Sequence, residues 1–328
     1  MISRVADCCF WFGRYIERTE ATARLLSVTR TLAMDAELEP RQCWLPVVIV
    51  IGEEPQFIDR TAEYATGHAS GEQVERYMTW EEENFSSIRR SIAAARENAR
   101  QIREVISLEV WETVNELYLW LGGADARADY ANDRIIFYRY VRQRCQLVAG
   151  LLRSTMLHEL PLNFIWLGML LERAGQTARV VDVQHHALMM RERENQFVET
   201  ALWLSLLRAC SAFEPFSKRN RGRITGDAVA HFLIFEPLFP KSIAYSVHEA
   251  ACRFEVIRPP LETSLPGAQT HARLHALDRW VKDHAAVGVA GDVHGVLTHV
   301  VDEIAEICSD LGRELFGQSA APALESAQ

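Results

Sequence analysis

The sequence predicts an all-α fold, a multi-helix bundle of about a dozen helices in which two related halves share one core. Long segments carry apolar residues at helical spacing with few breakers. Glycine and proline are scarce, at 17 and 11 of 328 residues, which disfavours a turn-rich β-sandwich or β-barrel. A content of 48% hydrophobic and 24% charged residues is ordinary for a globular protein, and it excludes a disordered or collagen-like chain.

The individual elements follow from apolar spacing and from the positions of breakers. Asn84 is predicted to cap a helix that starts near Phe85, and Pro161 fits the first turn of another. Leu45–Ile51 is interpreted as a short helix after Pro46, because no other strong strand signal offers it a partner. Irregular zones are expected at 215–226 and 258–267. The long helices are predicted near 3–34, 85–107, 124–156, 161–191 and 291–315.

An internal repeat indicates how the chain is organised. Residues 11–28 align without gaps onto residues 166–183, with eight of 18 positions identical at an offset of 155. That offset is too long for a solenoid repeat, so it indicates two related halves that each contain an equivalent helix. We therefore expect one helical domain over 1–316, with halves near 1–155 and 156–316 and a disordered tail at 317–328.

The repeated helix places charged residues where a core-facing helix rarely has them. On a helical wheel, Arg18 lies inside the broad apolar face of the first copy, whereas Gly13, Glu17 and Arg24 form a narrow stripe on the opposite side. The second copy is apolar almost all round, which predicts burial on most sides. Its corresponding glycine and charged residues are Gly168, Glu172, Arg173, Gly175 and Arg179.

Two interpretations of these charges remain open, and they can coexist. In the structural one, the Glu-Arg pairs at 17–18 and 172–173 bind one another or neighbouring helices, because a buried charge needs a partner. In the functional one, Arg18, Arg173 and further arginines at 24 and 179 hold a carboxylate or phosphate, which suits the planar guanidinium group. His185 and His186 continue the second copy and are candidates for an acid or base.

Several motifs together resemble the alpha-E domain, an all-helical family named for its Glu-Arg motif. They are Ser3-Arg-Val-Ala6, Trp11-x-Gly-Arg-Tyr-x-Glu-Arg18, Ala95-Arg-Glu-Asn-Ala-Arg100, Leu171-Glu-Arg173 followed by Thr177-Ala-Arg179, and the stretch from Phe232 to Ser242. The resemblance spans about residues 1–315. It implies a bacterial setting beside circularly permuted ATP-grasp proteins and transglutaminase-like proteases, in a system that forms or hydrolyses amide bonds.

From this setting we expect an accessory, non-catalytic role. The chain would bind the ligase-like partner or its peptide substrate through the surface near the two Glu-Arg helices. The alternative is an enzyme in which Arg18 and Arg173 fix a carboxylate while Glu17 or Glu172 is the general base. A third hypothesis is a helical dimerisation scaffold without a ligand. Met169 replaces Arg14 in the second copy, so an anion site built on that arginine would exist in one half only.

The net charge and the cysteine pattern limit which classes of partner, and which cellular compartment, are expected. A net charge of −9 disfavours binding to nucleic acid or to an anionic membrane surface. No apolar run is long enough to span a bilayer. Seven scattered cysteines without a C-x-x-C motif indicate reduced thiols in the cytoplasm.

No cofactor or metal is predicted. Glycine-rich nucleotide-binding motifs and the H-E-x-x-H motif are absent from the sequence. His271 and His275 are four residues apart and could share a helix face, but no carboxylate or cysteine completes a standard ligand spacing.

Overall fold

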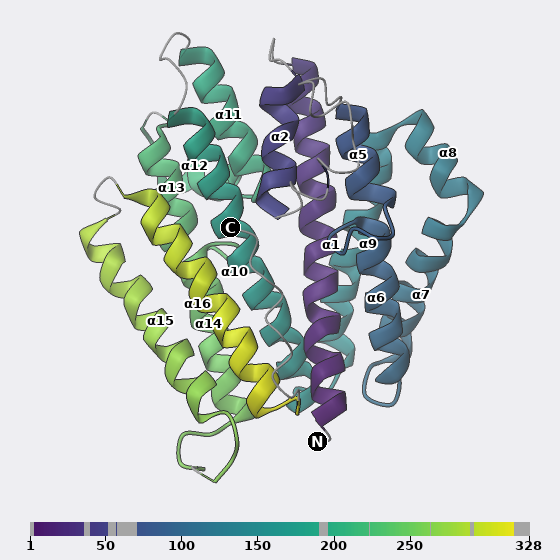
Figure 1. Ribbon diagram of the computed structural model, residues 1–328, viewed down its shortest axis with the longest axis vertical. Helices are drawn as coiled ribbons and strands as arrows, with labels where there is room; N and C mark the ends of the chain where they lie inside the picture. The colour runs from purple at the N-terminus through teal and green to yellow at the C-terminus, as the bar shows by residue number, and fades with distance from the viewer. Residues whose placement is uncertain are drawn as a thin grey trace.

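Fourteen α-helices and no strand make up the described part of the computed structural model (Figure 1). The structure describes residues 3–35, 40–51, 57, 71–189, 196–222, 224–262, 264–288 and 292–317. Apart from Gly317, the tail predicted to be disordered lies outside these residues. The helices are α1 (Ser3–Asp35), α2 (Pro40–Ile51), α5 (Gly71–Trp80), α6 (Ile88–Gln101), α7 (Leu108–Gly122), α8 (Ala124–Asn132), α9 (Arg134–Thr155), α10 (Leu160–Met189), α11 (Gln196–Ala209), α12 (Phe213–Arg219), α13 (Gly226–Phe235), α14 (Ile243–Ile257), α15 (Ala268–Val287) and α16 (Val293–Glu314).

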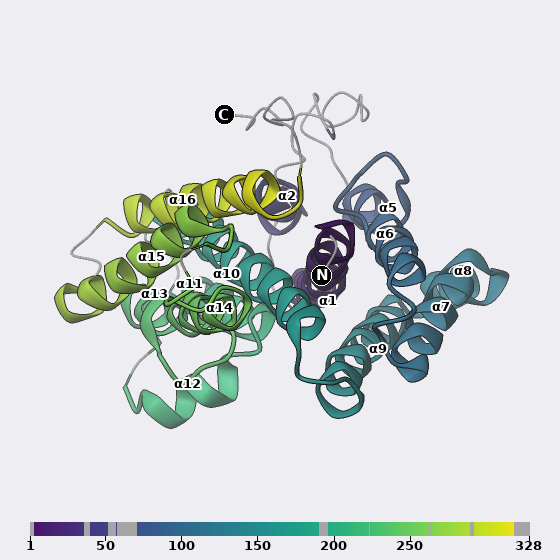
Figure 2. The ribbon, with the colours of Figure 1, turned by 90° about the horizontal axis from the view of Figure 1, so that it is seen from below.

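The two repeated helices, α1 and α10, lie side by side at the centre of the molecule (Figure 2). Helices α6 and α9 pack on α1, whereas α14 and α16 pack on α10. Helix α2 contacts both central helices. Each copy of the repeat is therefore the central helix of its own group of helices. The evolutionary relation of the two groups stays a prediction.

Because it lies between these groups, α1 is buried on nearly every side. Phe12 and Ile16 are buried as expected, but so are Glu17 and Arg24 in the stripe that the wheel placed opposite the apolar face. The expectation of a one-sided amphipathic helix was wrong, since α10 covers the second side. The almost complete burial predicted for α10 is confirmed by Leu167 and Leu171.

Local breaks differ from the predicted ones at two places. The helix predicted over 124–156 is two helices, because Asp133 interrupts it and its carboxylate accepts hydrogen bonds from the first amides of α9. Asn84 does not cap α6, which begins at Ile88. Ser87 is the cap, and its hydroxyl accepts the Arg90 amide at 3.1 Å. Asn84 instead closes the preceding turn by accepting the amide of Ser86.

The other local predictions hold, with one exception. Helix α10 begins at Leu160, so Pro161 occupies its first turn. The segment at 45–51 is helical, as part of α2, which starts earlier than expected and contains Pro46. The irregular zone predicted at 215–226 is wrong in part, because α12 occupies its first residues. Among the described residues, no helix is long and apolar enough to cross a membrane.

Candidate functional site

The site is built where α1 and α10 run parallel and touch at two glycines. A Cβ atom at Gly13 would lie 2.0 Å from the carbonyl oxygen of Ile165. A Cβ atom at Gly168 would lie 2.1 Å from the carbonyl oxygen of Phe10. Only a hydrogen fits at either position, so the two backbones approach as closely as small residues permit. The contacts are equivalent under exchange of the helices, since both glycines and both acceptors are 155 residues apart.

One turn beyond the glycines, the two Glu-Arg pairs exchange partners. The carboxylate of Glu17 accepts Nε and Nη2 of Arg173 at 2.8 and 2.7 Å. The carboxylate of Glu172 accepts Nε and Nη2 of Arg18 at 2.7 and 3.0 Å. Each glutamate thus makes a bidentate pair with the arginine of the other helix. These four residues form the interhelical ion pairs that the structural interpretation describes.

More arginines surround Glu172 than surround Glu17, the equivalent residue of the first copy. Nε and Nη2 of Arg14 lie 2.8 and 2.7 Å from Oε2 of Glu172, and the Gln176 amide donates to Oε1 at 3.1 Å. Burial alone would raise the pKa of Glu172, but Arg18 and Arg14 hold it well below its usual value. Arg14 also donates to Sγ of Cys308 in α16 at 3.2 Å. Glu172 is therefore an ionised carboxylate whose oxygens are already occupied.

Arg179 is the third arginine near Glu172, and it lacks the partner that its counterpart has. In the first copy, Arg24 pairs with Glu20 one turn earlier. The residue equivalent to Glu20 in the second copy is Gly175, so Arg179 has no carboxylate at that spacing. Its buried Nε has no hydrogen-bond partner among the residues that the structure describes.

Three guanidinium groups therefore surround one carboxylate. Burial lowers the pKa of Arg179, and the nearby charges of Arg18 and Arg14 lower it further, against the opposing effect of Glu172. Burial raises the pKa of the Cys308 thiol, so this thiol does not supply a second negative charge at neutral pH. The cluster formed by Arg14, Arg18, Arg179 and Glu172, called the arginine cluster below, carries two surplus positive charges.

Around Glu17, in contrast, the charges are better matched. Nζ of Lys241 lies 2.6 Å from the carboxylate of Glu20 and 3.8 Å from that of Glu17. Arg173 and Arg24 complete this second cluster. Beside it lies a cavity of about 30 Å³, which is large enough to hold water. The second cluster is suited to holding helices together.

The second cluster predicts a loss of stability in acid. Burial alone would raise the pKa of Glu20, but Lys241 and Arg24 lower it to about 2. A glutamate in the unfolded chain has a pKa of about 4.3. The stabilisation from the Glu20 ion pairs is therefore present above that pH and is lost as the pH falls towards 2. Glu20→Gln should remove at most about 3 kcal/mol of the acid-dependent change in unfolding free energy, measured by urea titration between pH 2 and 6. The exposed Glu104→Gln variant is the control, and equal pH slopes in the two variants would contradict this assignment.

The histidines predicted as acid or base lie away from both clusters. His185 is 13 residues beyond Glu172 on α10, about 20 Å along the helix axis, and its ring lies 6.2 Å from that of Trp203. It is therefore outside hydrogen-bonding reach of either glutamate. The side chain of His186 lies outside the described residues.

Sequence reasoning missed three residues that contact the predicted set. Lys241, Gln176 and Cys308 contact the glutamates or Arg14. Lys241 lies in the stretch 232–242, which is one of the motifs of the family resemblance. That motif could have identified Lys241 from the sequence. No local pattern pointed to Cys308, because it comes from a helix at the other end of the chain.

Comparisons with known proteins agree with this helical architecture. Residues 1–316 match Alpha-E, described as a predicted alpha-helical domain with a conserved ER motif. The Glu-Arg pairs at 17–18 and 172–173 both lie inside the matched range.

The curated relatives are longer proteins of unassigned activity. An uncharacterised protein of Mycobacterium bovis and two of Mycobacterium tuberculosis are each 22% identical to this chain over 293 residues. The match covers 82% of this chain and 30% of each relative, so the chain spans less than a third of their length. No solved structure matches the chain.

Proposed function

This chain belongs to the Alpha-E family, and we propose that it is a non-catalytic accessory component of an ATP-grasp-associated system that forms amide bonds in peptides. The arginine cluster would bind a carboxylate of the ligase-like partner or of its peptide substrate. The partners inferred from the family resemblance are a circularly permuted ATP-grasp protein and a transglutaminase-like protein. The proposed setting is the bacterial cytoplasm, where the chain's thiols would stay reduced.

The surplus positive charge at Arg179 is the observation that carries the proposal. A buried guanidinium without a partner costs free energy, and a bound anion would remove that cost. The side chains of Arg14 and Arg18 are 12% and 15% exposed, so an anion from solvent can reach the edge of the cluster. Arginine binds carboxylates and phosphates in a bidentate manner, and Arg179 has donors to spare.

The same geometry argues against the enzymatic alternative. A general base works best with a pKa near the operating pH, whereas the pKa of Glu172 is held well below its usual value. A thiol nucleophile needs a lowered pKa, but the pKa is raised at six cysteines, with burial as the first cause at each. Binding is therefore the function that these residues support best.

Two substitutions should weaken anion binding without unfolding the protein. Arg179→Gln removes the guanidinium group whose buried Nε has no hydrogen-bond partner among the described residues, and Gly175→Glu supplies the carboxylate that the first copy has at Glu20. A Cβ at Gly175 meets only the Arg179 guanidinium, at 3.4 Å and beyond, so the first atom of the new side chain makes an ordinary contact. Each variant should lower affinity for a carboxylate-bearing peptide at least tenfold, as expected for a lost charge-assisted hydrogen bond of about 1.5–3 kcal/mol.

The melting temperature distinguishes lost binding from lost structure. We expect both variants to melt at or above the wild-type temperature, because each relieves repulsion among the arginines. Arg144→Gln, at a surface ion pair with Glu116, is the control and should bind normally. Unchanged peptide affinity in both cluster variants would contradict the anion site.

An assay of amide-bond formation and hydrolysis tests the accessory role separately. The purified chain should not form or hydrolyse amide bonds by itself. An ATP-grasp protein from the same genome should form amide bonds faster when the chain is added, and Gly175→Glu should weaken this stimulation. Substrate-dependent turnover by the chain alone would instead establish the enzymatic alternative.

A further inference from the structure

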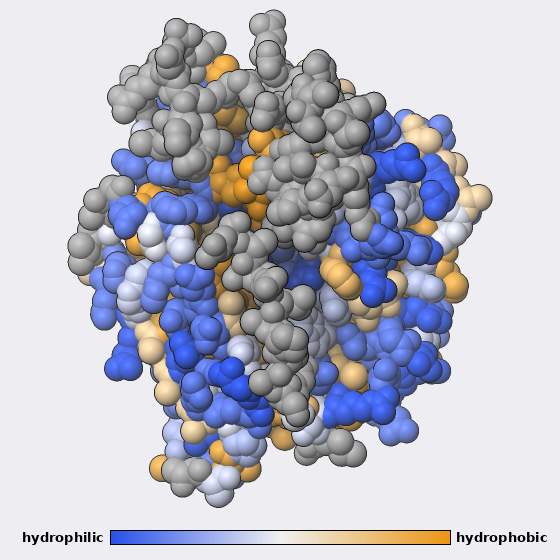
Figure 3. All heavy atoms as spheres, in the orientation of Figure 1, coloured by the Kyte–Doolittle hydropathy of each residue, from blue (hydrophilic) through white to orange (hydrophobic). Residues whose placement is uncertain are grey.

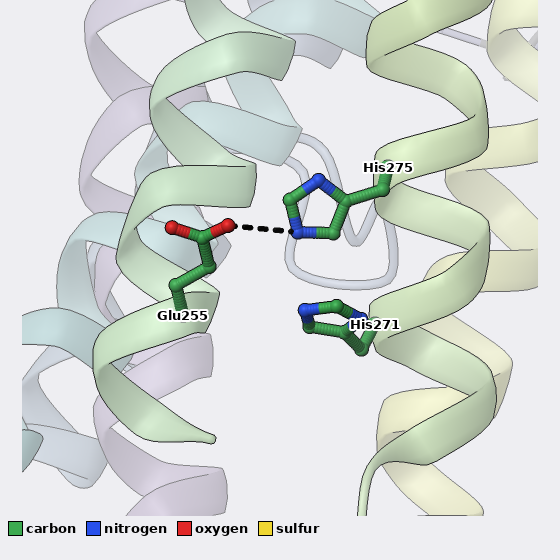
Figure 4. Close-up of side chains that lie close together, drawn as sticks. All are labelled: Glu255, His271 and His275. Carbon is green, nitrogen blue, oxygen red and sulfur yellow. Dashed lines mark ion pairs between the residues drawn. The ribbon is translucent and has the colours of Figure 1, made fainter. Parts of the chain in front are cut away.

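Three metal-ligating side chains meet between α14 and α15, at a place unrelated to the arginine cluster (Figure 4). His271 and His275 project from successive turns of α15 towards α14, and Glu255 projects from α14 towards them. One ligand atom from each residue lies within 4.8 Å of the other two. Sequence spacing did not show this group, because Glu255 comes from the neighbouring helix.

We propose that Glu255, His271 and His275 bind a divalent transition-metal ion of the zinc class. Two imidazoles and one carboxylate are a common set of three protein ligands for zinc, which leaves a fourth position for water or another ligand. Oε1 of Glu255 lies 3.3 Å from Nε2 of His275. Bond lengths near ~2.0–2.1 Å place two ligands of a tetrahedral ion about 3.3–3.4 Å apart, so this pair already has the required separation.

The state of the two imidazoles supports a metal more than a simple ion pair. Nε2 of His271 and Nε2 of His275 are both buried, and neither makes a hydrogen bond among the described residues. Their rings lie 4.3 Å apart on one helix face. A buried nitrogen without a hydrogen bond is unfavourable, and the Glu255 carboxylate forms an ion pair with Nε2 of His275 but not with that of His271. One cation between the two rings would bind both nitrogens.

The charges around the site permit a cation. Both imidazoles would bind the ion in their neutral form. Two arginines lie near the site: Arg258, which is close enough to Glu314 to lower the pKa of that carboxyl group, and Arg279, whose Nε donates to the carbonyl oxygen of His275 at 3.3 Å. The carboxylates of Glu255 and Glu314 therefore match the charges of these two arginines.

A bound ion would join α14 to α15 across the loop between them. The two helices run antiparallel, and His248 of α14 lies 3.3 Å from Asp278 of α15 farther along the same contact. Metal binding to the folded chain stabilises it by mass action, so the thermal transition should move upward with metal concentration. The expected ion is Zn²⁺ or Co²⁺ in preference to Mg²⁺, because imidazole nitrogen suits the former ions.

The test uses the purified chain after metal removal with a chelator. Titration with Co²⁺ should show one equivalent bound, with visible absorption bands of a four- or five-coordinate ion, and Zn²⁺ should displace it. His271→Gln and Glu255→Gln should each weaken Zn²⁺ binding at least tenfold, since loss of even an indirect supporting contact costs about 10–100-fold. Millimolar Mg²⁺ should not compete.

A matched histidine–carboxylate pair supplies the control. His294 lies 2.8 Å from Asp182 but has no third ligand nearby among the described residues. His294→Gln should therefore bind Zn²⁺ like the wild type. Circular dichroism of the metal-free variants should match the wild type, since the substituted side chains are partly exposed.

Three results would each overturn the proposal. The first is the absence of one-equivalent Co²⁺ binding by the wild type. The second is unchanged Zn²⁺ affinity in both His271→Gln and Glu255→Gln. The third is a thiolate-to-cobalt charge-transfer band that disappears in Cys252→Ser, which would assign the ion to a cysteine one turn from Glu255.

Discussion

Gly168→Ala should destabilise the protein by about 3 kcal/mol, although alanine is the better helix former. The added methyl group would lie 2.1 Å from the carbonyl oxygen of Phe10, and a backbone atom cannot rotate away. Helices α1 and α10 would have to separate, which loosens packing along the central contact and stretches the bidentate pairs beyond it. Urea unfolding of the variant and the wild type measures the change.

A second substitution shows whether helix separation is the cause. Gly13→Ala should cost about as much by itself, but the double variant should cost far less than the sum, because one separation makes room for both methyl groups. Gly150→Ala in α9 is the control, since nothing lies within 4 Å of its Cβ position, and it should stabilise by about 0.5–1 kcal/mol. If Gly168→Ala behaves like Gly150→Ala, the close approach of the two helices is wrong.

The parts of the fold that depend on local pattern could be predicted from the sequence. Helical spacing gave α1, α10 and α16 to within about two residues at most ends. Pro161 was placed in the first turn of α10 because proline lacks the amide that this turn leaves unpaired. The break at Asp133 was missed because apolar spacing continues across it, and only the capping hydrogen bonds reveal it.

The candidate site could be predicted only in part, for a different reason. The repeat identified both Glu-Arg pairs, but residue spacing does not say which glutamate meets which arginine. Glu17 pairs with Arg173, and Glu172 pairs with Arg18, because the two helices run parallel and touch at their glycines. Glu255 was missed as a ligand because its partners are on another helix, and tertiary contacts of that kind leave no local pattern.

Glu172→Gln should be among the most damaging substitutions of a polar residue in this chain. Breaking one side of a buried ion pair costs about 3–5 kcal/mol, because it leaves an uncompensated charge. Here three arginines would remain, at positions 14, 18 and 179, with no carboxylate among them. Glu17→Gln should cost less, because the neighbouring Glu20 still faces Lys241 and Arg24. Urea unfolding at pH 7 measures both differences.

A double-variant cycle tests whether repulsion among the arginines causes the loss. Adding Arg179→Gln to Glu172→Gln should restore part of the stability, since one of the three positive charges is removed. Arg144→Gln in the same background should restore none, because its ion pair joins α9 to Glu116 of α7, away from the arginine cluster. Equal effects of the two arginine substitutions would mean that the damage arises from packing around residue 172 and not from charge.

Added anions connect this stability effect to the proposed function. In Glu172→Gln the arginine cluster carries one more surplus positive charge than in the wild type, so formate or acetate should bind where the carboxylate was. The melting temperature of Glu172→Gln should therefore rise with formate concentration more steeply than that of the wild type, because binding to the folded state stabilises it by mass action. Chloride at equal ionic strength controls for screening. A rise that is equal in formate and chloride would show that the cluster has no specific affinity for carboxylates, and the proposed binding role would then lose its physical basis.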